Sequence, residues 1–89
     1  MVTLFVRHTV SDYKTWRKGY DDFAPVRGPL GVKAAAVYQA ADNPNDVTVT
    51  HEFATLEAAH GFAKSAELKA AMQHAGVVGA PTIWFANKV

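Results

Sequence analysis

Residues 47–53 read Val47-Thr48-Val49-Thr50-His51-Glu52-Phe53, an alternation of apolar and polar residues that carries one imidazole on its apolar side. Side chains alternate between the two faces of a strand, so the odd-numbered residues share one face and the even-numbered residues share the other. His51 therefore points toward the expected core. A titratable ring among apolar side chains has a tunable proton affinity, which makes His51 the first candidate for acid–base chemistry; the alternative is a hydrogen-bonded core histidine.

Size and composition limit the class of protein. A chain of 89 residues predicts one domain, residues 1–89, and so small a domain leaves apolar surface uncovered unless it self-associates. The hydrophobic share of 49% is high for that size and favours a homodimer. A formal net charge of +1 offers no basic surface, so we expect no nucleic-acid partner.

Location is predicted from three features of the sequence. No apolar run approaches the length that spans a membrane, and residues 2–7 read as a strand rather than as a signal sequence. The sequence contains no cysteine, which excludes disulfides and thiolate metal sites and fits a reducing compartment. We therefore expect a cytoplasmic protein without a membrane partner.

The first part of the chain predicts a strand, a helix and a second strand. Val2–Val10 is rich in β-branched and aromatic residues, which are typical of strands. Ser11 or Asp12 offers a cap for a helix with one aromatic face. That face carries Tyr13, Trp16, Tyr20 and Phe23. Prolines and glycines then end the helix, and the chain returns as a strand over roughly 32–40.

The second part predicts a hairpin, a pair of helices and a last strand. The turn formers Asp42-Asn43-Pro44-Asn45-Asp46 predict a hairpin that leads into the strand with His51. Thr55 then caps one helical segment and Ser65 caps another. The second of these has an apolar stripe formed by Leu68, Ala71, Met72 and Ala75. The last strand is predicted to run from Pro81 to Ala86.

This order, β-α-β-β-α-β, predicts an α+β protein with the ferredoxin-like fold, in which helices cover one face of a four-stranded antiparallel sheet. The other face, with Thr50 and either Trp84 or Phe85, lacks a cover and is unfavourable in water. A symmetric homodimer is the expected remedy. Arg7 and Glu52 also fall on that face, where we expect an ion pair inside the dimer.

Four stretches carry a resemblance to a known family: Val2–His8, Asp12–Trp16, Asn43–Phe53, and Ser65–Met72 followed by Ala75-Gly76-Val77. They resemble the dimeric α+β barrel superfamily and, within it, the small antibiotic biosynthesis monooxygenase-like and cyclase-like proteins. The resemblance covers nearly the whole chain. It implies two subunits paired as a dimeric α+β barrel, each with a pocket between helices and sheet for small aromatic or polyketide-like molecules. It implies no cofactor; the haem-degrading branch uses an asparagine that the first strand lacks.

The parity of the strands selects the side chains that would line such a pocket. If the apolar face lies under the helices, it takes His51 and Phe53 from the third strand and His8 from the first. A symmetric hairpin would place Val37 opposite His51, with Ala35 and Gln39 on the same face, whereas a slip of one residue would exchange them for Ala34, Ala36 and Tyr38. The small side chains of the second strand would leave volume beside the polar groups, as a ligand site requires.

The first helix contributes the opposite wall of the predicted pocket. Tyr13, Trp16 and Tyr20 carry polar tips that need a partner or a ligand when they are buried, so they are candidates for substrate binding together with His8 and Phe53. Phe23 is expected to be ordinary core, because aromatic stripes normally pack.

No metal or nucleotide site is predicted. The strand register places His8 about 10 Å from His51, which makes them poor partners for one metal ion. His60 and His74 lack the i, i+4 spacing of a zinc-binding helix and are expected at the surface. The sequence also has no glycine-rich phosphate loop.

Three functional hypotheses remain. The first is a cofactor-free monooxygenase or cyclase in which His51 takes a proton from a phenolic or enolisable molecule while a tyrosine or tryptophan holds the oxygen. The second is a non-catalytic homodimeric module that binds a small aromatic or apolar ligand. The third is a structural dimer without a ligand. Composition does not separate the first two, since one scaffold hosts many functions.

Overall fold

The structure is a computed structural model that describes all 89 residues. Strands and helices follow one another in the order β-α-α-β-β-α-α-β. The elements are β1 (Val2–Val10), α1 (Tyr13–Asp22), α2 (Ala24–Arg27), β2 (Ala34–Ala40), β3 (Asn43–Phe53), α3 (Leu56–Ala63), α4 (Ala66–His74) and β4 (Val77–Asn87). None of the helices is long and apolar enough to cross a membrane.

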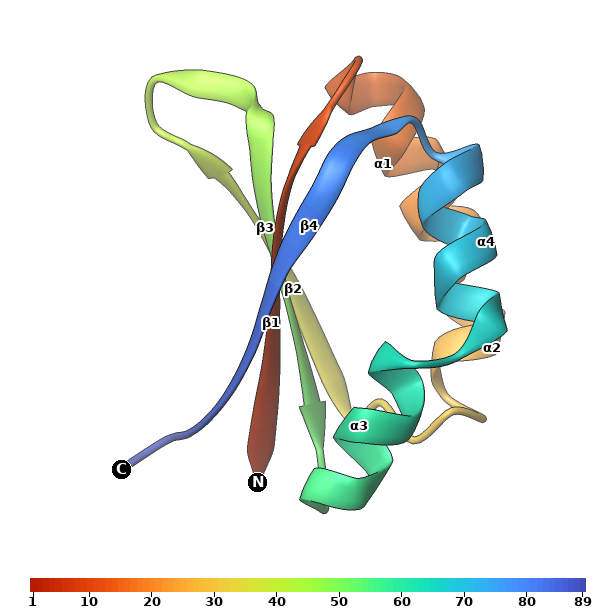
Figure 1. The fold of residues 1–89 in the computed structure, drawn as a ribbon, viewed down its shortest axis with the longest axis vertical. Coiled ribbons are helices and arrows are strands. Elements are labelled where there is room, and N and C mark those ends of the chain that lie inside the picture. The colour runs from red at the N-terminus through yellow and green to blue at the C-terminus, as the bar shows by residue number, and fades with distance from the viewer.

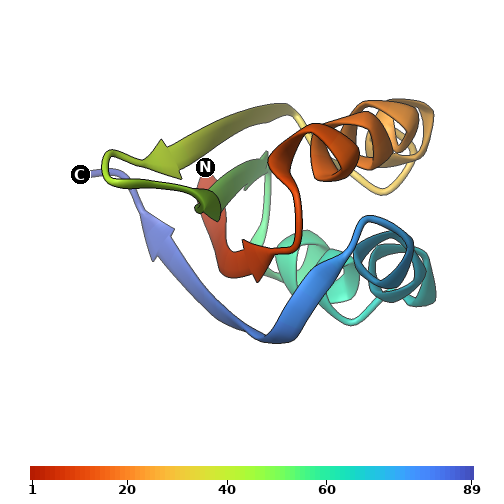
Figure 2. The same cartoon turned by 90° about the horizontal axis from the view of Figure 1, so that it is seen from above.

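The strands form one antiparallel sheet in the order β2-β3-β1-β4. All helices lie on the same face of this sheet, as Figure 1 and Figure 2 show from two directions. The predicted ferredoxin-like fold is therefore confirmed. The central strands, β1 and β3, alternate apolar and polar residues most clearly, and their apolar sides face the helices.

The inward side chains form two hydrophobic clusters rather than one continuous core. One cluster includes Phe53 and Phe62, whose ring centroids lie 5.4 Å apart, and the other includes Trp16 and Val47. Each buried side chain of this size contributes about 2–3 kcal/mol of transfer free energy. Residues of both clusters line one cavity between the sheet and the helices.

Asp12, Thr55 and Ser65 cap α1, α3 and α4, as predicted. The Asp12 carboxylate accepts hydrogen bonds from the backbone N–H and the hydroxyl of Thr15 at 3.0 and 2.9 Å. These two bonds hold the pKa of Asp12 below its usual value. Since each cap sets the residue at which its helix begins, the caps also set which side chains face the sheet.

Replacing Asp12 with alanine is expected to lower the free energy of unfolding by about 1 kcal/mol, because a first-turn N–H loses its acceptor. Chemical denaturation near pH 7 measures this change. Asp12→Asn is the matched control, since it keeps an acceptor oxygen and should lose only a few tenths of that amount. An equal loss in both variants would contradict the capping role.

Three local predictions were wrong. The β2–β3 turn consists of Ala41 and Asp42, so residues 43–46 belong to β3. β4 begins at Val77, well before Pro81. Each added segment has a neighbouring strand on one side only, because β4 is an edge strand and β1 pairs with β3 no further than Asp46. Pro44 and Pro81 can therefore lie in these strands without the loss of a hydrogen bond between strands. Third, the tighter turn, together with a register shift between Gln39 and Ala40, pairs His51 with Ala35 instead of Val37, a shift of two residues that leaves the facing of β2 unchanged.

The sheet face opposite the helices, which we call the open face, is lined by aromatic side chains. Phe5 pairs with Trp84 in the β1–β4 register, and their rings stack with centroids 5.1 Å apart. Phe85 therefore points toward the helices. Tyr38 lies on the same open face through its pairing with Thr48, and the exposed fractions of Tyr38 and Trp84 are 58% and 42%.

The predicted ion pair between Arg7 and Glu52 is absent. Arg7 instead donates two hydrogen bonds to the Asp46 carboxylate, at 3.0 and 2.6 Å. Glu52 pairs with Thr3, toward the opposite end of β1. The prediction used the facing of the two residues but not their register, and the register separates them along the strand.

Candidate functional site

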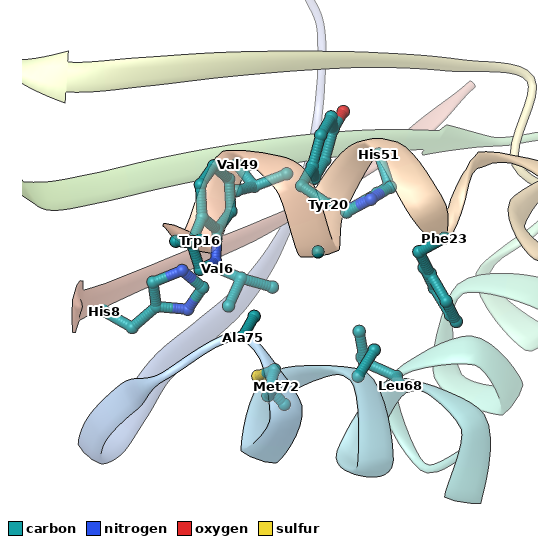
Figure 3. A pocket seen from close by; sticks show the side chains of 12 residues that line it. Val6, His8, Trp16, Tyr20, Phe23, Val49, His51, Leu68, Met72 and Ala75 are labelled. Atoms are coloured by element: carbon teal, nitrogen blue, oxygen red, sulfur yellow. The ribbon is translucent and has the colours of Figure 1, made fainter. Parts of the chain in front are cut away.

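A cavity of about 40 Å³ lies between the sheet and the helices α1 and α4. Figure 3 shows its lining from close by. Of the 12 lining residues 9 are hydrophobic. The twelve lining residues are Val6 and His8 of β1; Trp16, Gly19 and Tyr20 of α1; Phe23, which follows α1; Val49 and His51 of β3; and Leu68, Ala71, Met72 and Ala75 in and just beyond α4.

His51 reaches this cavity from the C-terminal part of β3. Its side chain packs against Phe62, with ring centroids 4.9 Å apart, and the residue is only 4% exposed. Burial, and to a lesser degree the positive charge of Arg27, lowers the pKa of His51 to about 4. The ring is therefore neutral near pH 7, and its buried Nδ1 has no hydrogen-bond partner. A neutral imidazole without a partner can accept a hydrogen bond or a proton.

His8 reaches the cavity from β1 and is 6% exposed. Its ring meets the edge of Trp16, with centroids 5.6 Å apart. Burial lowers the pKa of His8, while the nearby Asp46 carboxylate opposes that shift. Both ring nitrogens of His8 are buried and lack a hydrogen-bond partner.

The two histidines lie toward opposite ends of the cavity. His51 pairs with Leu4, whereas His8 pairs with Val47, so the register separates the two by four positions along the strands. At the rise of a strand this corresponds to about 13 Å, somewhat more than the 10 Å expected from the sequence. Figure 3 shows the same arrangement, with His8 beside Trp16 and His51 on the side of Phe23.

The aromatic face of α1 forms one wall of the cavity. Trp16 is buried and its ring stacks on that of Tyr20, with centroids 5.1 Å apart. The hydroxyl of Tyr20 points away from the cavity (Figure 3), so Tyr20 contributes ring surface rather than a hydrogen bond. Arg27 lies over the outer side of this ring, 4.1 Å from its centroid, and donates a hydrogen bond to the Tyr20 carbonyl at 2.7 Å.

The sequence-predicted residues are only partly brought together. His51, His8, Trp16 and Tyr20 line one cavity. Tyr13 lies outside it, and its hydroxyl accepts a hydrogen bond from Arg17 at 3.5 Å. Phe53 also lies outside and is fully buried in the core.

Several lining residues were not predicted to be part of the site. Phe23 was expected to be core but borders the cavity, and the stripe of α4 forms the wall opposite α1. The apolar periodicity of α4 was visible in the sequence, but periodicity does not distinguish a side chain that fills a core from one that borders a void. The charge of Arg27 was missed because its segment was read as a loop.

The potential metal ligands are dispersed, and the remaining two histidines, His60 and His74, lie outside the cavity. No group of three or more His, Cys, Asp or Glu side chains is close enough to hold a metal ion. His60 and His74 are exposed, as expected, and His60 stacks on Phe85 with ring centroids 4.5 Å apart.

Comparison with known proteins identifies structural relatives only. No family model matches the sequence, and no curated protein matches it. A protein from Bordetella bronchiseptica, provisionally named an antibiotic biosynthesis monooxygenase, superposes with a TM-score of 0.86 at 15% identity, over 99% of this chain and 96% of that one. A similarly named protein from Nitrosomonas europaea gives 0.76 at 14% identity, over 100% and 99%.

SnoaB of Streptomyces nogalater, a cofactor-independent oxygenase, superposes with a TM-score of 0.75 at 13% identity, over 99% of this chain and 94% of that one. These matches span nearly the full length of each protein, while their identities are too low to compare individual residues. The likeness is therefore one of fold, and this chain has the ferredoxin-like fold of the antibiotic biosynthesis monooxygenase-like proteins.

Proposed function

We propose that this protein is a cofactor-independent oxygenase- or cyclase-like enzyme that takes a proton from a small phenolic or enolisable aromatic molecule in the cavity. Two observations support the proposal: His51 and His8 line one apolar cavity, and three of their ring nitrogens, Nδ1 of His51 and both nitrogens of His8, are buried without a hydrogen-bond partner. Leaving a buried polar group unsatisfied costs about 1–3 kcal/mol. A bound hydroxyl would remove part of that cost.

The low pKa of His51 sets the protonation state from which the proposed reaction starts. A ring with a pKa of about 4 is already deprotonated near neutral pH, so it does not need to lose a proton before it accepts one. Once the substrate hydroxyl has ionised beside it, the new anion favours the imidazolium and raises its proton affinity. The positive charge of Arg27, which acts on His51, would also favour that anion.

In the oxygenase form of the reaction the substrate supplies every electron. His51 accepts the hydroxyl proton, the electron-rich anion adds O₂ at a ring carbon to form a hydroperoxide, and loss of water leaves a quinone. One oxygen atom stays in the product and the other leaves in water together with the ring hydrogen and the returned proton. A phenol and O₂ thus give a quinone and water without an external reductant.

The cavity must open before a ring can enter. Its volume of about 40 Å³ holds roughly three water molecules, and no aromatic ring fits that space. Met72 is the most adaptable side chain of the wall, because it is half-buried and unbranched and has three rotatable bonds. Displacing it would join the cavity to a second hollow between α4 and β4, which Met72 also borders.

The test of the reaction is oxygen uptake by the purified protein with naphthols and dihydroxynaphthalenes in chelator-treated buffer. The proposal expects one O₂ consumed for each quinone formed. Saturable binding without oxygen uptake or any other product would support the alternative, a non-catalytic binding module. The small cavity and the weak basicity of His51 are the observations that favour this alternative.

The open face supports the proposal that the functional unit is a homodimer. It is hollowed by about 390 Å³, and Phe5, Tyr38 and Thr50 lie in the hollow. Trp84 and Tyr38 expose large aromatic surfaces there, and exposed aromatic patches of this kind mark interaction sites. Two copies of the same face pair by a two-fold axis, which buries both.

Replacing Trp84 with glutamate is expected to weaken this dimer at least about 30-fold, because a central aromatic side chain contributes about 2 kcal/mol or more to such interfaces. Analytical ultracentrifugation measures the dissociation constant. Leu56→Glu is the control, since Leu56 is 50% exposed on α3 in the helical layer and should leave association unchanged. A wild-type protein that stays monomeric at high micromolar concentration would contradict the proposal.

A further inference from the structure

The polar groups of the cavity are confined to its two ends. The 12 lining residues comprise 9 hydrophobic ones, the glycine of α1 and the two histidines. Val6 and Val49 pair with each other midway between the levels of His51 and His8, so the sheet-side wall is apolar at its centre. Figure 3 shows Val6 and Val49 in that intermediate position.

A ligand with a single hydroxyl cannot satisfy both ends. A hydrogen bond joins heavy atoms about 3 Å apart, whereas the strand register separates the two histidines by about 13 Å. When one ring receives its partner, the other remains buried and unpartnered. Such a group is costly in a native structure and calls for an explanation.

We propose that the natural ligand is an elongated aromatic molecule with an oxygen function at each end, one on His51 and one on His8. This inference rests on the proposed function, because it assigns the substrate class of the same cavity. The two oxygens would lie about 10 Å apart. This is the separation of the two histidines along the strands, about 13 Å, shortened by a hydrogen bond at each end that is inclined to the strand direction. Trp16 and the valine pair would enclose the flat body of the ligand.

The charges near the two ends give the ligand a preferred direction. Arg27, the charged group that acts on His51, lies 4.1 Å from the centroid of the Tyr20 ring that lines the cavity. Asp46, the one that acts on His8, adjoins Val47, the strand partner of His8. Asp46 is in turn paired with Arg7, which reduces its effect. The more acidic hydroxyl is therefore favoured at the His51 end, near the unpaired cation, and the less acidic oxygen at the His8 end.

The test compares 4,4′-dihydroxybiphenyl with 4-hydroxybiphenyl by isothermal titration calorimetry. These ligands share one rigid body and differ only in the second hydroxyl, which lies at the far end. Wild-type protein is expected to bind the dihydroxy compound about 10-fold more tightly or better, because the second end also gains a hydrogen bond. In His8→Leu this preference should be lost or reversed, because the second hydroxyl would be buried against leucine without a partner. Exposed His74→Gln is the control and should keep the full preference.

His8→Gln provides a second variant, since its amide can still hydrogen-bond and should retain part of the preference even if His8→Leu folds poorly. A full preference that persists in folded His8→Leu would overturn the proposal of a two-ended ligand, because His8 would then not be the hydrogen-bond partner of the second hydroxyl. Equal binding of both ligands by wild type, or binding of neither, would also overturn it. The proposed function is judged separately, by oxygen uptake with compounds that carry a single hydroxyl.

Discussion

Replacing His51 with glutamine is expected to lower turnover of a phenolic substrate at least about 100-fold, while substrate affinity changes little. Glutamine occupies a similar volume and can still accept a hydrogen bond, so the hydroxyl should bind as before. Glutamine cannot hold the proton that the reaction releases, and positioned general-base catalysis is worth about 10²–10⁴ in rate. Turnover number and KM, measured by oxygen uptake, separate the two effects.

His74→Gln is the matched control for this experiment, because His74 is exposed on α4 and does not line the cavity. It should leave both kinetic constants unchanged. If His51→Gln turned over as fast as the wild type, His51 would not be the base. If it lost affinity but not turnover, the role of His51 would be binding alone.

Mild acid is expected to destabilise the fold by about 3 kcal/mol between pH 6.5 and pH 4. In the unfolded chain His51 regains its ordinary pKa of 6.5, whereas burial holds it near 4 in the native state. Over this interval the unfolded state binds more protons, so the free energy of unfolding falls as the pH falls. A pKa difference of this size corresponds to about 3 kcal/mol, and burial of His8 acts in the same direction.

Denaturant unfolding at a series of pH values measures this slope. Carboxylates with lowered pKa values, such as Asp12 and Asp46, lose their stabilising effect only below about 3.8 and therefore do not account for it. In His51→Leu most of the slope should disappear, and stability near pH 7 should rise because an unpartnered polar ring is removed. An unchanged slope in that variant would show that His51 is not held neutral by burial.

The facing of His51 could be predicted because it depends on a local pattern. Alternation over residues 47–53 allows one apolar side, and the imidazole shares it with valines and a phenylalanine. The caps at Thr55 and Ser65 were equally predictable, since a cap is a contact between neighbours in the sequence. The order of these elements then leaves few topologies, and the ferredoxin-like sheet is the simplest.

The cavity could not be predicted, because it depends on how closely two helices approach each other. Gly19 of α1 meets Ala75 just beyond α4, and a Cβ on Gly19 would lie 3.0 Å from the Cβ of Ala75. This contact sets the spacing of the helices that flank the void. Parity placed Phe53 on the correct face, but Phe62 of α3 covers it, and no pattern within β3 reveals that neighbour.

Registers were the other source of error. A strand pattern gives the face of each residue but not its partner, so Arg7 was matched with Glu52 when its true partner is Asp46. The pairing of His51 was displaced for the same reason, because the turn closes at Ala41 and Asp42 and the register shifts between Gln39 and Ala40. Turn length is decided by the fit of two strands to their neighbours, which is a tertiary property.

The most direct measurement is an NMR titration of the His51 ring in protein with isotope-labelled histidine, with and without 4-hydroxybiphenyl. His51 should titrate near pH 4 in the free protein, well below 6.5, and its pKa should shift when the phenol binds, because the ring then gains a hydrogen-bond partner. The ring signals of exposed His60 and His74 should not respond to the ligand. A His51 ring that titrates near 6.5, or one whose titration is the same with and without bound ligand, would contradict the account.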